Sequence, residues 1–201
     1  RVHADLKREN ILVGEDYATT LIDLDDSHKS TPKNRGIFGS LETLSPDCFF
    51  EGAEHGTEKD MWAAGAVLFE LATGRLLQDF LLLPEDRNDP SWGRLEEQEE
   101  AALAQEVLAL NKNILGFPLQ LELTGERRIF LRPAVLLQKI RRDRRVSLEE
   151  AQRELQLAID KIVDQKVLEG SVLKPVIKGL LQLRAQERLS AQTALKLLDG
   201  S

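Results

Sequence analysis

Apolar residues form short runs near the start of the chain and follow helical spacing further on. Ile11-Leu12-Val13 and the stretch 17–22 are rich in apolar and β-branched residues, and the turn-forming residues Gly14-Glu15-Asp16 separate them. Short runs of this kind on either side of a turn predict a small β-hairpin. Downstream the apolar residues recur every three or four positions. The pattern therefore predicts an α+β protein that is mostly α.

The strongest helical pattern lies between Thr57 and Gly74. Thr57, with Asp60 three positions later, is predicted to start the helix in a manner similar to a capping box, and Gly74 is predicted to end it. We expect this helix to be buried, because its apolar residues occupy nearly every face. Those at regular helical spacing are Met61, Ala64, Val67, Leu68 and Leu71, and those on other faces are Trp62, Ala63, Ala66 and Phe69.

A long stretch of 112 residues separates Arg75 from Arg188. Its first expected elements are a loop over 76–94, an amphipathic helix over 95–110 and a hairpin over 119–131 around Thr124-Gly125. Ser147 and Glu150 then have the spacing of a capping box, and apolar residues at helical spacing follow them. Further helices are expected from residue 173 onward and over 190–198.

Composition and charge exclude several classes of protein. With 42% apolar and 30% charged residues, the chain has the composition of one globular domain. A net charge of −7 argues against a general nucleic-acid binder, which needs an excess of lysine and arginine. The single cysteine, Cys48, excludes an internal disulfide and a cysteine-rich zinc site, so we expect a reducing, cytoplasmic setting. No apolar run approaches a membrane span, and no signal peptide opens the chain.

Residues suited to catalysis gather in the stretch 3–10, and Asp23 follows thirteen positions after Asn10. A carboxylate, an ammonium group, an amide and a second carboxylate at these spacings suit phosphoryl transfer to a hydroxyl. Asp5 is expected to orient the hydroxyl and accept its proton. Lys7 is expected to neutralise charge on the transferred phosphoryl group, and Asn10 with Asp23 to hold Mg²⁺.

At these residues the chain resembles the protein kinase family. The stretch 2–13 resembles the family's catalytic loop, usually written HRDLKxxN, and Leu21-Ile22-Asp23 resembles the strand end that delivers the DFG aspartate to the metal. The further matches follow in the family's order. They are 39–47 with GTxxYxAPE, 59–65 with the start of the long buried helix of the large lobe, and 188–190 with the arginine near the end of that lobe.

The resemblance implies a protein kinase that uses ATP and Mg²⁺ and acts on protein substrates. The lysine at position 7 is typical of kinases that act on serine and threonine. Ser40 stands where the family's threonine ties the peptide-binding loop to the catalytic aspartate and lysine. The resemblance also implies structural roles for four residues. His3 would be structural, and Asp60 would hold the backbone of the catalytic loop. Asp47 and Arg188 would form an ion pair.

The resemblance begins in the middle of a kinase domain. The catalytic loop occupies 1–13, the activation segment 23–47, and an insertion is expected within 76–165. No stretch matches the family's glycine-rich loop, strand lysine or helix glutamate, which cover the nucleotide phosphates. We therefore expect the chain, 1–201, to be the large C-terminal lobe, with an N-terminal lobe supplied elsewhere, and the 201 residues alone to be inactive.

Several departures from the family pattern leave alternatives open. Ala4 replaces the arginine that pairs with a phosphate on the activation segment, so phosphorylation is not expected to be the switch. Leu24 and Asp25 replace the phenylalanine and glycine of DFG. Asp25 and Asp26 either enlarge a metal site or are solvated. The alternative to a kinase is a pseudokinase or scaffold that binds a partner protein through this lobe and its insertion.

The basic run 141–145 also has two interpretations. Its arginines either dock an acidic partner or phosphate, or form the solvated end of a helix. Cys48 is expected to be a small buried residue, because no group that would activate a thiol stands near it in sequence.

Overall fold

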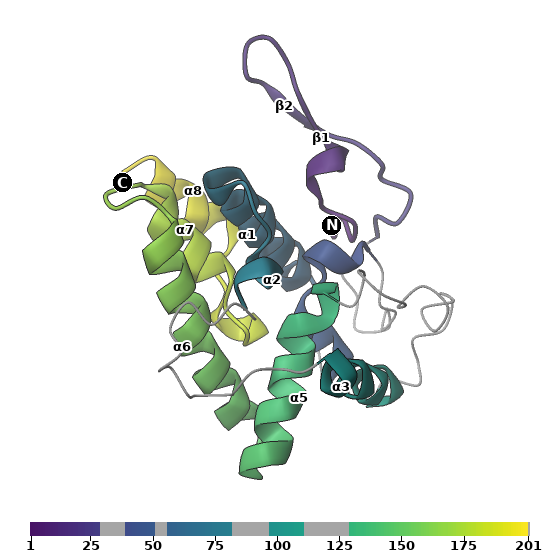
Figure 1. Ribbon diagram of the computed structural model, residues 1–201. Helices are drawn as coiled ribbons and strands as arrows, with labels where there is room; N and C mark the ends of the chain where they lie inside the picture. Colours follow the sequence, from purple (N-terminus) through teal and green to yellow (C-terminus); the bar gives the residue numbers. More distant parts are fainter. Residues whose placement is uncertain (29–38, 51–55, 82–96, 111–128, 201) are drawn as a thin grey trace.

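The structure is a computed structural model that describes residues 1–28, 39–50, 56–81, 97–110 and 129–200. In these residues a two-stranded hairpin stands above a body of helices (Figure 1). The mostly α fold with a small antiparallel sheet, predicted from the sequence, is confirmed. None of the described helices combines the length and the apolar character that crossing a membrane requires.

The hairpin pairs β1 (Ile11–Val13) with β2 (Thr19–Leu21) in antiparallel register, with Ile11 opposite Leu21. Its turn is closed by the Gly14 amide, which donates to the Ala18 carbonyl at 2.8 Å. The predicted hairpin is thus confirmed. It projects away from the helices (Figure 1), and it carries the exposed apolar side chains Leu12, Val13, Tyr17 and Leu21.

Helix α1 (Glu58–Thr73) is the buried helix that the sequence predicts, and Gly74 ends it with φ +72°. The predicted capping at Thr57 is wrong. Thr57 has helical backbone angles and makes no side-chain cap hydrogen bond. In a capping box the Asp60 carboxylate would bind the backbone at the start of its own helix. Here it accepts hydrogen bonds from the backbone amides of His3 and Ala4 instead.

The long stretch after α1 is mainly helical. The short helix α2 (Leu77–Phe80) lies where a loop was predicted, and α3 (Glu97–Leu110) confirms the predicted amphipathic helix to within two residues. Helix α5 (Arg132–Arg144) was not predicted. Most of the predicted hairpin at 119–131 lies outside the described residues, but its last three positions, 129–131, form a 3-10 turn and not a strand.

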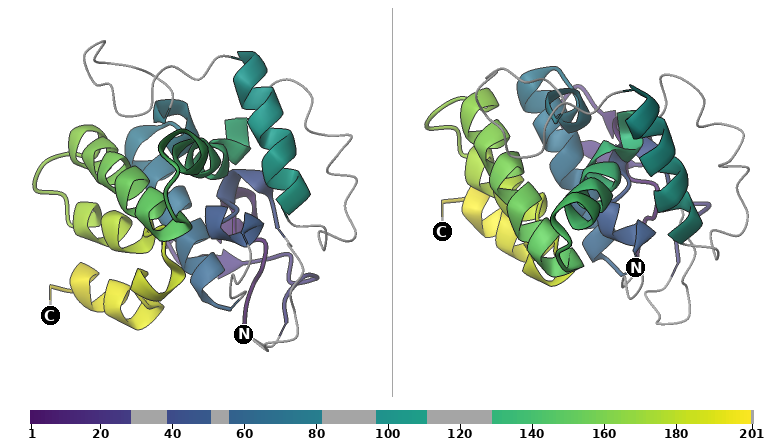
Figure 2. Two further views of the ribbon diagram at one scale, coloured as in Figure 1. Left: turned by 90° about the horizontal axis from the view of Figure 1, so that it is seen from below. Right: turned by 60° about the horizontal axis from the view of Figure 1, so that its bottom comes forward.

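Helix α6 (Leu148–Lys166) begins at the predicted capping box. The Ser147 side chain accepts from the Glu150 amide, and the Glu150 carboxylate accepts from the Ser147 amide, so the prediction is confirmed. Helices α6, α7 (Leu173–Leu180) and α8 (Ala191–Leu198) follow one another side by side (Figure 2). The short 3-10 turns are η1 (Arg8–Asn10), η2 (Leu41–Thr43), η3 (Pro46–Phe49) and η5 (Ala185–Glu187).

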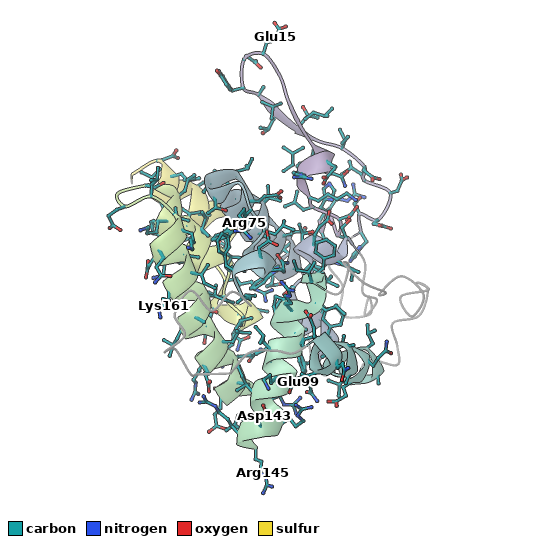
Figure 3. The ribbon with its side chains drawn as sticks, viewed as in Figure 1. Glu15, Arg75, Glu99, Asp143, Arg145 and Lys161 are labelled. Atoms are coloured by element: carbon teal, nitrogen blue, oxygen red, sulfur yellow. The ribbon has the colours of Figure 1, made fainter. Side chains whose placement is uncertain are left out.

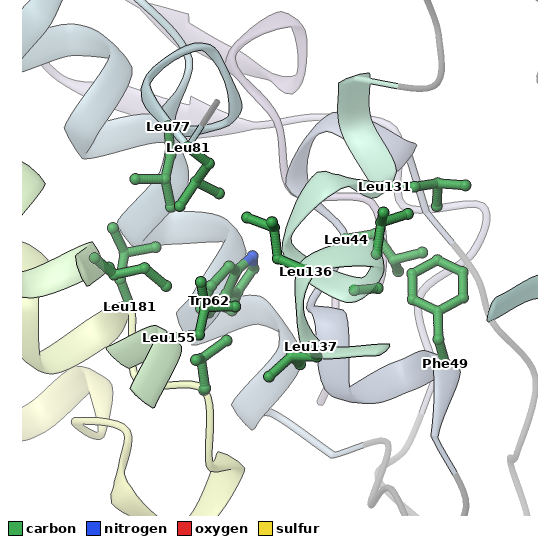
Figure 4. Close-up of a cluster of buried hydrophobic side chains, with 14 of the residues drawn as sticks. Leu44, Phe49, Trp62, Leu77, Leu81, Leu131, Leu136, Leu137, Leu155 and Leu181 are labelled. Atoms are coloured by element: carbon green, nitrogen blue, oxygen red, sulfur yellow. The ribbon is translucent and has the colours of Figure 1, made fainter. Parts of the chain in front are cut away.

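The hydrophobic core joins parts of the chain that are far apart in sequence. Trp62 of α1, Leu137 of α5 and Leu155 of α6 belong to one buried cluster (Figure 4), and none of these residues is more than 1% exposed. The helices α5 and α6, which lie within the expected insertion, therefore form part of the core that supports α1.

Candidate active site

The backbone at the start of the catalytic loop is fixed by α1. The His3 amide donates to Asp60 Oδ2 at 2.7 Å, and the Ala4 amide donates to Asp60 Oδ1 at 3.0 Å. Ala4 has φ +76°, a conformation that is unfavourable for a residue with a Cβ atom. The buried carboxylate of Asp60 thus holds a strained turn directly before Asp5.

The His3 ring connects the catalytic loop to the end of the hairpin. Its Nδ1 accepts from the Asp5 amide at 3.4 Å, so its Nε2 carries the proton and donates to the Ile22 carbonyl at 3.1 Å. The His3 residue is 8% exposed. A buried neutral ring with both nitrogens bonded has a structural role, and it places the residue before Asp23 against the loop that carries Asp5.

The Asp5 carboxylate is bound by three side chains. Oδ1 accepts from the Ser40 amide at 2.7 Å and from the Ser40 hydroxyl at 2.8 Å. Oδ2 lies 2.8 Å from Lys7 Nζ and 3.3 Å from Asn10 Nδ2. Lys7 Nζ also donates to Ser40 Oγ at 2.8 Å. The structure therefore brings together four of the residues predicted from the sequence.

These contacts change the titration of Asp5 and Lys7. Burial pushes the pKa of the Asp5 carboxyl upward, but the hydrogen bonds from Lys7 and Ser40 outweigh burial, so this pKa lies below its ordinary value. The hydrogen bond to Asp5 raises the pKa of Lys7. Both groups are thus held in their charged forms near neutral pH.

Gly39 allows Ser40 to approach Asp5. It has φ +109°, and a Cβ atom at this position would lie 2.3 Å from the Ala4 carbonyl oxygen. Any other residue would have to push the chain away from the catalytic loop. The close approach of these two backbones therefore requires glycine.

Asn10 and Asp23 are placed differently from each other. Asn10 is 4% exposed, and its Nδ2 donates to the Asp5 carbonyl at 2.8 Å, which leaves its Oδ1 available to a cation. The Ile22 amide donates to the Asn10 carbonyl at 3.0 Å and keeps the strand end beside the loop. Asp23 is exposed, with φ +60°. An amide oxygen and a carboxylate are donor types that Mg²⁺ binds, and the ion often takes only one or two protein ligands beside phosphate oxygens and water.

Asp25 and Asp26 lie outside any cluster of acidic, histidine or cysteine side chains suited to a metal ion among the described residues. Both are exposed. Within the described ranges no group of three or more histidine, cysteine, aspartate or glutamate side chains is arranged to hold a metal ion. The arrangement favours the interpretation that these two carboxylates are solvated.

Asp47 and Arg188 form a buried ion pair. Arg188 Nη2 lies 2.6 Å from Asp47 Oδ1, and the two side chains are 1% and 11% exposed. The Ser45 hydroxyl also donates to Asp47. The ion pair that the family resemblance implies is therefore present, and it fixes the end of the loop that begins at Ser40.

Sequence reasoning missed a second set of polar contacts around the site. Arg8 binds Glu9 at 2.7 Å and Glu70 of α1 at 2.6 Å.

Glu42 of the turn η2 belongs to the same set. Burial raises the pKa of its carboxyl, and the negative charge of Glu9 raises it further. Gln78 of α2 is 2% exposed and donates to the Glu42 carbonyl. These contacts join residues up to 62 positions apart, so no local sequence pattern predicts the set.

The basic run 141–145 ends helix α5, where neighbouring carboxylates bind it. Arg142 lies 2.7 Å from Glu99, and Arg144 lies 2.7 Å from Glu154. Figure 3 shows Glu99 on α3 near Asp143 on α5, and both carboxylates bind Lys139. The run is thus an ion-paired helix end, which disfavours an open site for an acidic partner.

Comparison with known proteins supports the motif resemblance. A family model described as protein kinase domain matches residues 1–197. An Aurora kinase of Saccharomyces cerevisiae is 39% identical over 75 residues, which cover 36% of this chain and 20% of that protein. The developmentally-regulated protein kinase 1 of Dictyostelium discoideum is 34% identical over 77 residues, or 37% of this chain and 11% of that protein.

A third relative is the serine/threonine-protein kinase kin-29 of Caenorhabditis briggsae. It is 37% identical over 75 residues, which cover 36% of this chain and 9% of that protein. The matched segments thus span about a fifth or less of each of these three relatives.

Proposed function

The chain belongs to the protein kinase family, and from this we propose that the complete domain transfers the γ-phosphoryl group of ATP to serine and threonine hydroxyls of proteins. We propose further that this chain is the C-terminal lobe of that domain. The observation that carries the proposal is the Asp5 carboxylate, which the side chains of Lys7 and Ser40 both bind at 2.8 Å. Its position suits a base for a substrate hydroxyl that enters between Asp5 and Lys7.

Asp5 takes the proton of the substrate hydroxyl as the hydroxyl oxygen bonds to the γ-phosphorus and the bond from that phosphorus to the β-phosphate oxygen breaks, which releases ADP. A carboxylate offers about four lone-pair positions, and the contacts of Ser40, Lys7 and Asn10 already occupy them. One donor must therefore move when substrate binds. Lys7 is the mobile donor, because turning its ammonium group toward the phosphoryl oxygens frees Asp5 and brings positive charge to the place where negative charge increases. Ser40 keeps Asp5 oriented meanwhile.

Asn10 and Asp23 are the proposed ligands of Mg²⁺. The ion would neutralise the phosphate charges of ATP and orient the transferred group. The bond from Asn10 Nδ2 to the Asp5 carbonyl keeps the amide oxygen turned away from Asp5. Asp23 is exposed and free of the helical body, so its carboxylate is accessible to the ion. The proposed roles of the two residues are therefore compatible with their surroundings.

The proposed partners are a protein substrate and an N-terminal lobe. The hairpin carries large apolar side chains that are well exposed, among them Leu12 at 53% and Tyr17 at 85%. A β-hairpin with exposed apolar residues needs a partner surface to bury them. An N-terminal lobe above the hairpin would supply that surface and the missing phosphate contacts.

The proposed setting is the reducing cytoplasm. Cys48 is 2% exposed, and burial raises the pKa of its thiol to about 12. A buried thiol of this kind is inert, which supports the interpretation of Cys48 as a packing residue.

The test of the function is the Asp5→Asn variant of the complete protein, assayed with ATP, Mg²⁺ and a protein substrate. We expect kcat to fall by about 10² to 10⁴, the range for a positioned base. The control is Asp16→Asn, which keeps an acceptor for the Ala18 amide in the hairpin turn and should retain activity. Unchanged turnover in Asp5→Asn would refute the proposed role of Asp5.

A scaffold is the second candidate function. Ala4 and the sequence Asp23-Leu24-Asp25 favour it, because a domain that only binds a partner does not need the arginine and glycine that they replace. Binding of ATP with Mg²⁺ to the complete protein separates the two functions. A kinase must bind the nucleotide, and Asp23→Asn must weaken that binding in a Mg²⁺-dependent manner. A protein that binds neither ATP nor Mg²⁺ is a scaffold.

A further inference from the structure

The loop that presents Ser40 is fixed from behind by a buried glutamine. Ser40 directly precedes the turn η2, and within that turn the Glu42 carbonyl accepts from Gln78 Nε2 at 2.9 Å. Gln78 lies in α2 and is 2% exposed. Because the donor is buried, its loss would remove the bond that fixes this turn to α2.

Arg132 connects Gln78 to helix α3. Its Nη1 donates to the Gln78 backbone carbonyl at 3.2 Å, and its Nε donates to Glu100 Oε1 at 2.9 Å. Glu100 is 8% exposed, so its charge depends on Arg132 for compensation. A guanidinium has several donors in a fixed plane and can therefore bind α2 and α3 at once.

The polar contacts are continuous from α3 to Asp5. Glu100 binds Arg132, Arg132 binds Gln78, and Gln78 binds the turn that follows Ser40. Ser40 in turn donates both its amide and its hydroxyl to Asp5. The first three members lie in the stretch between Arg75 and Arg188, so this stretch has a direct connection to the candidate active site.

We propose that Gln78 and Arg132 are positioning residues, and that the docking of α3 on α5 controls how firmly Ser40 holds Asp5. The importance of Asp5 rests on the proposed function, but the coupling itself does not require catalysis. A protein or ligand that displaces α3 would loosen the Asp5 contacts. By linkage, binding that orders Asp5 and Ser40 would strengthen the docking of α3 by the same factor.

The same helix pair offers a matched control. Gln138 of α5 donates its side-chain amide to Glu106 of α3 at 3.2 Å, and this contact is exposed. Gln138→Met therefore removes this exposed bond between α3 and α5, and the bond that Gln138 Oε1 accepts from Arg141 at 3.4 Å, and it leaves the polar chain intact. Gln78→Met removes the donor to Glu42 and keeps a side chain of similar length.

The test compares these two variants of the complete protein by the hydrogen exchange rate and the chemical shift of the Ser40 amide proton. In Gln78→Met we expect the Ser40 amide to exchange at least about tenfold faster, which corresponds to about 1.4 kcal/mol. We also expect its chemical shift to move toward the value in Asp5→Asn, because the bond to Asp5 weakens. In Gln138→Met both quantities should stay close to those of the parent. Equal exchange rates and equal shifts of the Ser40 amide in the two variants would overturn the proposal.

A second variant keeps the proposal testable where Gln78→Met does not fold. Arg132→Lys keeps a cation for Glu100, but one ammonium group on a flexible stem cannot reproduce the two directed bonds of the guanidinium. The same rise in the exchange rate and the same change in the chemical shift of the Ser40 amide are expected, and unchanged values would again refute the coupling. Full activity of Asp5→Asn would instead refute the proposed function and leave these contact measurements unaffected.

Discussion

Arg188 and Asp47 lie 141 positions apart in the sequence, yet Arg188 Nη2 is 2.6 Å from Asp47 Oδ1. The guanidinium also donates to the carbonyls of Gln182, Glu58 and Leu183. Hydrogen bonds that involve a charged donor are stronger than neutral ones. This one side chain therefore joins the loop after Ser40, the start of α1 and the segment before α8.

Replacing Arg188 should destabilise the whole lobe. In Arg188→Met we expect the free energy of unfolding to fall by about 3–5 kcal/mol, because the Asp47 carboxylate stays buried without a cation. Urea unfolding followed by Trp fluorescence measures the change. The control is Arg184→Met, whose ion pair with Glu187 is 29% and 45% exposed. Its loss should cost less than about 1 kcal/mol, and equal losses in the two variants would contradict the prediction.

The contacts of Asp5 should disappear at acid pH. The pKa of Asp5 in the folded protein lies below its ordinary value of 3.8, because hydrogen bonds from Lys7 and Ser40 outweigh the effect of burial. Because this pKa is lower in the folded than in the unfolded protein, the contacts of Asp5 stabilise the fold fully at any pH above the Asp5 pKa of the unfolded chain. The stabilisation is lost as the pH falls through the Asp5 pKa of the folded protein. The Ser40 amide resonance should follow a transition with a midpoint below 3.8 that is absent in Asp5→Asn. A midpoint above 3.8 would show that burial dominates.

Phosphorylation of the segment after Asp23 should have little effect on activity. Ala4 offers no charge to an added phosphate, whereas an arginine there would connect the phosphate to the catalytic loop. Replacing Ser27, Ser30 and Thr31 together by alanine should therefore change the activity of the complete protein by no more than about threefold. A change of this size in rate is smaller than the loss of one charge-assisted hydrogen bond would cause. Initial rates before and after phosphatase treatment measure this. A tenfold loss confined to the alanine variant would reveal control by another route.

The elements predicted from the sequence are those with local signals. The hairpin follows from apolar runs around Gly14-Glu15-Asp16, and α6 follows from the capping box of Ser147 and Glu150, whose partners lie three positions apart. Helix α1 follows from nearly continuous apolar positions at helical spacing. In each case the residues that determine the element are neighbours in sequence, so the local pattern is sufficient to predict it.

The predictions failed or were missing where a distant partner decides the structure. The local helix-start pattern predicted that Asp60 caps its own helix, but its carboxylate binds backbone amides 56 and 57 positions away. That contact agrees with the role that the family resemblance implied for Asp60, which is to hold the backbone of the catalytic loop. Helix α5 was missed because charged residues dilute its apolar face, and only packing against α3, α6 and the turn η3 shows that this face is buried. The motif located Asp5, Lys7 and Ser40, but it carried no information on Gln78, whose role depends on a bond to a carbonyl.

The close approach of Gly39 to Ala4 leads to the last prediction. Gly39→Ala places a Cβ atom 2.3 Å from the Ala4 carbonyl oxygen, so the loop must move and take Ser40 away from Asp5. We expect a loss of about 1–3 kcal/mol in the free energy of unfolding and an upward shift of the Asp5 midpoint. Gly170→Ala is the matched control, because Gly170 has φ +76° but no atom within 4 Å of the added Cβ. Gly170→Ala should lower the free energy of unfolding only through its unfavourable backbone conformation, by about 1 kcal/mol. It should leave the titration of Asp5 unchanged. An Asp5 midpoint that stays at the parent value in Gly39→Ala would mean that Ser40 keeps its contacts without the close approach of the two backbones.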